Sequence, residues 1–154
     1  MCFYDYDNET LFTGDVADGR GTVRDSFVYI TDVQGFYDSM EELSELNVGT
    51  LLLGHNYLPY QRAVLRGRRA KGLIAHTVAI NDEIRKIILR LLKTYPQPLT
   101  AAEMSALIVP RIGPGYVLPS QEPNPTILAH LRALMEENRV EMTERAGSKL
   151  WRLR

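Results

Sequence analysis

The sequence of 154 residues is poor in cysteine and histidine and contains no long apolar run. Its single cysteine, Cys2, excludes an internal disulfide framework and suits a reducing cytoplasm, where we expect the protein to reside. No apolar stretch approaches the roughly 20 residues that span a bilayer, so we expect no membrane segment. The acidic start of the chain is also unlike a basic signal peptide. An apolar content of 45% and a charged content of 24% are typical of a globular protein.

The charge is divided unevenly along the chain, although the net charge is only −1. Residues 1–60 carry 11 acidic and 2 basic side chains, a net charge of −9. Residues 61–110 carry 3 acidic and 9 basic side chains, a net charge of +6. The acidic segment suits a cation site built from carboxylates, and it also suits a solvated surface, which is the commoner use of such a segment.

Local patterns predict an α/β arrangement in the first third of the chain. Residues 2–7 and 9–16 flank a turn at residues 7–8, which indicates a β-hairpin. Residues 34–47 place apolar side chains at helical spacing, and residues 50–53 form an apolar strand without alternation, which predicts burial on both faces. A strand, helix, strand order implies a parallel pair with a right-handed crossover. Two such strands would leave a sheet edge and a sheet face open to water.

Residues 81–154 predict three helices followed by a hairpin. The clearest helix covers residues 82–95, and a capping box formed by Thr100 and Glu103 opens a second helix that runs to about residue 108. A proline-rich link covers residues 110–125, and Pro125 begins the third helix. Residues 140–153 form the hairpin. This order predicts a winged helix-turn-helix domain.

Two of the predicted strands end in side chains that can bind a metal ion. The run from Leu11 to Gly14 is followed by Asp15, and the run from Leu51 to Gly54 is followed by His55. Open α/β layers keep their sites at the carboxyl ends of strands, and aspartate and histidine are good zinc ligands. Each motif alone is more often turn or capping chemistry. The pair, with a helix between the two strands, favours a metal site.

The segments Cys2–Asp7, Asn8–Asp15, Phe36–Leu46 and Thr50–His55 together resemble the second half of a metallo-β-lactamase superfamily domain. The C-terminal part resembles the winged-helix module appended in one hydrolase branch, the β-lactamase-like-protein-2 type. The resemblance implies an α/β fold, half of an αββα metallo-β-lactamase sandwich, followed by a winged helix-turn-helix domain. The implied domains are the half-sandwich at 1–60, a helical connector at 61–80 and the winged helix at 81–154.

The resemblance also implies the roles of the two candidate ligands in a two-metal, zinc-type hydrolase site. Asp15 would bridge the two ions, and His55 would bind the second ion. The main metal motif of the family, His-x-His-x-Asp-His, is absent, because the three histidines, His55, His76 and His130, are too far apart to form it. We therefore expect a chain that starts after most of the active site, carries no catalytic residue of its own and is inactive alone. A complementing N-terminal half or a homodimer partner would supply the rest.

Two weaker groups of candidate residues lie after His55. Tyr57 and Tyr60 stand where the resemblance places the mouth of the site, and could contact substrate, although packing is the default for such residues. Basic side chains gather in residues 61–72, where they could contact phosphates of RNA or DNA, or form a solvated helix face. The candidates for nucleic-acid contact are Arg66, Arg68, Arg69 and Lys71.

An alternative function is a nucleic-acid-binding winged-helix protein, and a further alternative is a non-catalytic interaction module. We expect Thr126, His130 and Arg132 to be exposed on the third helix, which is a thin set for reading a major groove. Glu136 and Glu137 oppose such a role, because acids beside phosphate are unfavourable. A packing, dimerisation or substrate-guiding role is therefore favoured for this domain.

Overall fold

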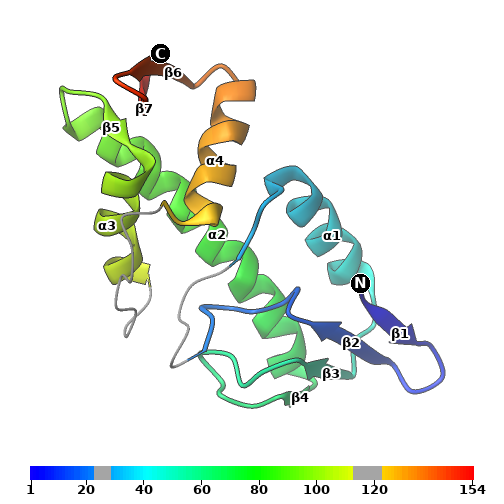
Figure 1. The fold of residues 1–154 in the computed structure, drawn as a ribbon. Helices are drawn as coiled ribbons and strands as arrows, with labels where there is room; N and C mark the ends of the chain where they lie inside the picture. The colour runs from blue at the N-terminus through cyan, green and yellow to red at the C-terminus, as the bar shows by residue number, and fades with distance from the viewer. Residues whose placement is uncertain (23–28, 113–122) are drawn as a thin grey trace.

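The computed structural model describes residues 1–22, 29–112 and 123–154. These residues form two separate β-sheets joined by one long helix, α2 (Arg68–Thr94), which runs from one sheet to the other (Figure 1). The predicted mixture of strands and helices is confirmed.

The first sheet has four strands in the order β1-β2-β3-β4. The first two strands pair antiparallel as the predicted hairpin, and β2 and β3 pair parallel on either side of helix α1 in the chain. The predicted crossover is therefore present. A fourth strand that the sequence patterns did not indicate pairs antiparallel with β3 at the edge of the sheet. The bounds are β1 (Phe3–Asp5), β2 (Thr10–Gly14), α1 (Val33–Glu45), β3 (Thr50–Leu53) and β4 (Val64–Arg66).

Helices α1 and α2 cover one face of this sheet. Leu11, Leu51 and Leu65 are cross-strand neighbours on that face, and each is at most 2% exposed. They pack with buried side chains of both helices in one hydrophobic cluster. Asp32 fixes the start of α1, because its side chain accepts a hydrogen bond from the backbone N–H of Gly35 at 3.1 Å.

The opposite face of the same sheet is uncovered by the described residues. Phe3, Phe12, Leu52 and Val64 lie in one register row across all four strands. Phe3 is 66% exposed, Phe12 is 45% exposed and Val64 is 48% exposed. The expectation that β3 is buried on both faces is therefore wrong, because only Leu51 in this strand is fully buried. The row is an apolar surface that faces solvent.

Helix α2 belongs to both hydrophobic clusters of the molecule. Its first part contributes Ala70, Leu73 and Ile74 to the cluster under the first sheet, and residues 80–92 contribute to a cluster around the second sheet. The helix predicted over residues 82–95 ends where expected but begins earlier, at Arg68. Most of the predicted helical connector therefore belongs to the same continuous helix. The region expected to be a helical connector also contains strand β4.

The C-terminal elements surround the second sheet, whose strand order is β5-β7-β6. The predicted capping box is present, because Thr100 Oγ1 accepts from the Glu103 N–H at 3.1 Å and Glu103 accepts from the Thr100 N–H at 2.7 Å. Residues 113–122 of the proline-rich link lie outside the described residues. The elements are β5 (Leu99–Thr100), α3 (Ala101–Ile112), α4 (Pro125–Glu136), β6 (Val140–Arg145) and β7 (Ser148–Leu153).

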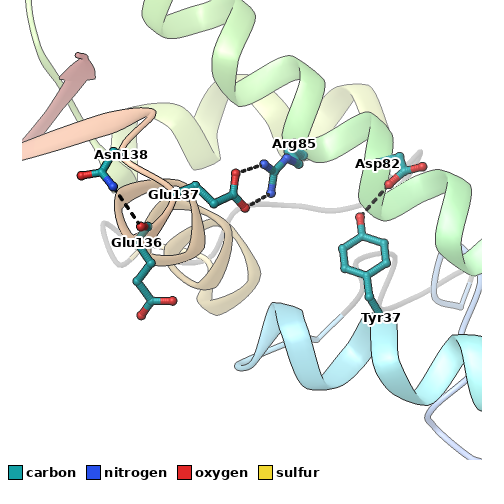
Figure 2. Close-up of polar contacts among 6 residues, drawn as sticks. All are labelled: Tyr37, Asp82, Arg85, Glu136, Glu137 and Asn138. Carbon is teal, nitrogen blue, oxygen red and sulfur yellow. Dashed lines mark hydrogen bonds and ion pairs between the residues drawn. The ribbon is translucent and has the colours of Figure 1, made fainter.

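Successive turns of α2 hold α1 and the end of α4 (Figure 2). The hydroxyl of Tyr37 on α1 donates to Asp82 at 2.7 Å, and one guanidinium N–H of Arg85 donates to Glu137 at 2.8 Å. Asp82 and Arg85 are three residues apart and therefore lie on one face of the helix. The first contact joins α1 to α2, and the second joins the end of α4 to α2.

Polar side chains are buried in the middle of α2, between its two hydrophobic parts. Thr77 and Asn81 are each 0% exposed, and Thr77 Oγ1 accepts from the Gly19 N–H at 2.9 Å. His130 on α4 is also 0% exposed, with Nε2 3.3 Å from Asn81 Oδ1. The expectation that Thr126 and His130 are exposed is wrong, because α4 turns this side toward the core.

Within the described ranges, no helix combines the length and apolarity that crossing a lipid bilayer requires. Helix α2 is long enough, but charged side chains recur along it.

Candidate metal centre

Asp15 and His55 lie together at the carboxyl edge of the first sheet. Asp15 directly follows β2, and His55 comes two residues after the parallel strand β3. The two strand ends are joined by a hydrogen bond of 2.9 Å from the Gly54 N–H to the Gly14 carbonyl. His55 Nε2 is 3.7 Å from Asp15 Oδ1, and the side chains are 62% and 70% exposed. Both donors can therefore be reached from solvent.

Gly54 leaves the space that the Asp15 carboxylate occupies. A Cβ atom at position 54 would meet Asp15 Oδ1 and would also lie 3.3 Å from the Gly14 carbonyl carbon. A side chain here would push the carboxylate away from the strand end. The glycine before His55 therefore leaves room for the Asp15 carboxylate in its observed position.

Tyr57 supports Asp15 at this edge. The Tyr57 hydroxyl donates a short hydrogen bond to Asp15 Oδ1, and its ring meets the His55 ring edge-on with centroids 5.8 Å apart. Tyr57 is only 4% exposed, and burial, with the Asp15 hydrogen bond, raises its pKa. The tyrosine thus holds a carboxylate in place, whereas Tyr60 packs in the first hydrophobic cluster beside Gly72.

A second carboxylate near Asp15 was not singled out from the sequence. Asp15 and Asp18 both line a hollow of about 450 Å³ at the end of β2. Asp18 is 8% exposed, and its Oδ1 has no hydrogen-bond partner among the described residues. Burial raises the pKa of Asp18 to about 8; hydrogen bonds from the backbone of Asp18 and Tyr29 oppose the rise, and the Asp15 charge adds to it. An aspartate in a loop carries no sequence signal of such burial.

The basic candidates separate into two places. Arg66, Arg68 and Arg69 line one hollow together with Arg62, beside the edge strand β4. Lys71 lies instead at an apolar hollow between α1 and α2. The structure therefore brings three of the four predicted basic residues together and adds Arg62 to them.

Asp15 and His55 do not by themselves make a catalytic zinc site. A catalytic zinc usually takes at least three ligands from the protein, and these are two donors. In the part of the chain that the structure describes, no group of three or more His, Cys, Asp or Glu side chains could hold a metal ion. The donor chemistry suits zinc, but the donor number does not, and no reaction step can be assigned to this pair alone.

Two solved structures share the fold of this chain. No protein-family model matches the sequence, and no curated protein matches it. A metallo-beta-lactamase family protein from Thermus thermophilus aligns over 99% of the chain, with 21% identity and a TM-score of 0.64. The chain has part of the metallo-β-lactamase fold. A beta-lactamase domain protein from Burkholderia ambifaria aligns equally far, with 16% identity and a TM-score of 0.65.

The chain spans less than half the length of these two proteins. It covers 44% of the Thermus chain and 43% of the Burkholderia chain. The alignment includes both sheets and α2, because it extends over nearly all of the present sequence. The prediction of a partial metallo-β-lactamase fold is confirmed, and the winged-helix domain and the site residues stay predictions.

Proposed function

We propose that this chain is the part of a metal-dependent hydrolase that carries Asp15 and His55, and that it is inactive without the remaining ligands. The observation that carries the proposal is the 3.7 Å approach of these donors at the sheet edge, in a metallo-β-lactamase-type fold. The gap left by Gly54 and the hydrogen bond from Tyr57 support it, since both position Asp15. Zinc is the ion we propose, because one carboxylate and one imidazole are ligands typical of zinc.

We propose that the remaining ligands come from a further polypeptide segment that packs on the uncovered sheet face. The row formed by Phe3, Phe12, Leu52 and Val64 supports this, because apolar side chains in register across a sheet are normally covered. The solved proteins of this fold are more than twice as long as the chain, so a segment large enough to cover the face has a precedent. A second copy of the chain is the alternative occupant.

The C-terminal elements support a proposal of their own. The order α2, β5, α3, α4, β6, β7, with a three-stranded sheet, is the order expected of a winged-helix domain. We propose a packing role for this domain. The side of α4 that holds Thr126 and His130 is buried, so these residues are not presented to a DNA groove.

A hydrolysis assay tests the proposed function. The purified chain, supplied with zinc, is expected to cleave neither a phosphodiester nor a thioester faster than the Asp15→Ala/His55→Ala double variant does, because two ligands do not hold a catalytic zinc. Turnover by the chain alone that is lost in the double variant would contradict the proposal. Activity that rises with the square of chain concentration would assign the missing ligands to a second copy and overturn the separate-segment proposal.

A further inference from the structure

Four arginine side chains surround one hollow at the edge of the first sheet. The hollow has a volume of about 580 Å³, within the range of about 300–1,000 Å³ that ligand sites commonly occupy. Four of its six lining residues are arginines and none is acidic. The lining is Arg62, Val64, Leu65, Arg66, Arg68 and Arg69.

None of these four arginines forms an ion pair with the described residues. The ion pairs in that part of the chain join His55 to Asp15, Arg85 to Glu137 and Arg152 to Glu141. The first turn of α2, which holds Arg68 and Arg69, contains no acidic side chain. The hollow is therefore a concentration of positive charge that the described residues leave unneutralised.

The backbone that carries Arg66, Arg68 and Arg69 is tied to the first sheet. Leu65 is 2% exposed and anchors β4 in the core, so that Arg66 lies on the outer side of the strand. Gly67 turns the chain with a φ of 53°, and its N–H donates to the Gly49 carbonyl at 2.8 Å. This turn brings Arg68 and Arg69 back beside β4. The four charges thus come from the loop before β4, from β4 itself and from the first turn of α2.

A structural explanation for this charge is protection of the sheet edge. β4 is an edge strand, and charged side chains on an edge prevent unwanted pairing with other strands. That explanation accounts for Arg66 on the strand itself. It gives no reason for Arg68 and Arg69, which lie on α2, to face the same hollow. Edge protection requires no ligand, so a binding experiment distinguishes this explanation from a binding site.

The side chains that line the hollow indicate which class of ligand it would bind. Arginine presents a planar fork of donors that matches phosphate oxygens, and repeated phosphates suit several arginines in one place. The lining contains no aromatic side chain on which a base could stack, so base identity should contribute little. Val64 is the one large apolar side chain exposed in the lining, which is too little for membrane insertion.

We propose that the hollow lined by Arg62, Arg66, Arg68 and Arg69 binds the phosphodiester backbone of a nucleic acid without regard to base sequence. This binding site is separate from the Asp15–His55 pair. It shares Val64 with the apolar row that we propose a further segment covers, so the proposal is made for the chain without that segment. It also differs from groove reading by a winged helix, because α4 takes no part in it.

Salt dependence of DNA binding tests the proposal. A fluorescently labelled duplex of about 20 base pairs is titrated with the full chain at NaCl concentrations from about 25 to 200 mM, and anisotropy gives the affinity. Four phosphate contacts predict a slope of log affinity against log salt of about −3.6. Arg66→Gln/Arg68→Gln should weaken binding and reduce the slope to about −1.8. A duplex of unrelated sequence should bind the wild type equally well.

A matched variant on the same helix serves as control. Lys86 and Arg90 lie on the later part of α2, and Lys86→Gln/Arg90→Gln removes the same charge at a distance from the hollow. This control should keep the wild-type slope, and both variants should keep the wild-type circular dichroism spectrum. The proposal is overturned by an absence of binding at the lowest salt, by equal slopes for the two double variants, or by binding to phosphatidylserine vesicles but not to DNA.

Discussion

The wild-type protein should lose stability as pH rises from about 6.5 to 8, and the Asp18→Asn variant should not. Burial raises the pKa of the Asp18 carboxyl from 3.8 to about 8 in the folded state. In the unfolded chain the carboxyl ionises near its ordinary value. Between the two values the folded state holds a proton that the unfolded state has released, so raising the pH favours unfolding.

The sign and size of this effect follow from the two pKa values. The stabilising contribution is complete below about pH 4 and is lost by about pH 8. Its slope is at most about 1.4 kcal/mol per pH unit, so the loss between pH 6.5 and 8 is on the order of 2 kcal/mol. Asparagine resembles the protonated carboxyl in shape but cannot ionise, so the variant should be more stable than the wild type at pH 8.

Urea unfolding followed by circular dichroism at several pH values measures the Asp18 effect. Asp7→Asn is the control, because Asp7 is an exposed aspartate at the hairpin turn. The Asp7→Asn variant should show the same dependence of unfolding free energy on pH as the wild type. A decline of equal steepness in Asp18→Asn and in the wild type would mean that Asp18 is not the group that titrates.

The second large effect is a loss of stability on acidification, which we expect to come from His130. Burial and, to a smaller extent, the nearby charge of Arg85 together lower the pKa of this imidazole to about 4, while Asp82 opposes the shift. The folded value lies below the ordinary value of 6.5, so the stabilising contribution is present above about pH 6.5 and is lost as pH falls to about 4. The difference corresponds to about 3 kcal/mol.

The His130 effect is best measured in the Asp18→Asn background, because the two slopes oppose each other between about pH 4 and 6.5. Adding His130→Gln should remove the loss of stability on acidification. His55→Gln is the matched control, because the His55 side chain is 62% exposed. If the His130→Gln variant still loses about 3 kcal/mol of unfolding free energy between pH 6.5 and 4, the buried histidine is not the cause of the loss on acidification.

The elements that the sequence predicted well are those specified by local patterns. The hairpin of β1 and β2, helix α1 and the parallel strand β3 follow from apolar spacing and turn residues that lie within each segment. The approach of Asp15 to His55 followed from the same reasoning, because parallel strands place their carboxyl ends at one edge. Strand β4 has three residues and too little pattern to be recognised.

The features that the sequence did not predict depend on contacts between distant segments. His130 and Asp18 are polar, and their burial is decided by α2 and by the loop after β2, not by neighbours in sequence. Arg62 joins the other arginines only because β4 and α2 fold back on each other. The role of Tyr57 likewise requires the turn after β3 that brings its hydroxyl to Asp15.

Zinc binding to the purified chain tests the central claim most directly. Calorimetric titration should show weak binding of one zinc ion to the wild type. The affinity should fall by at least about tenfold in Asp15→Ala/His55→Ala, since losing even a group outside the ligand set costs about 10–100-fold. Asp7→Ala/His76→Ala removes the same residue types elsewhere and should bind as the wild type does. Equal zinc affinity in all three proteins, or no binding to the wild type, would contradict a metal role for Asp15 and His55.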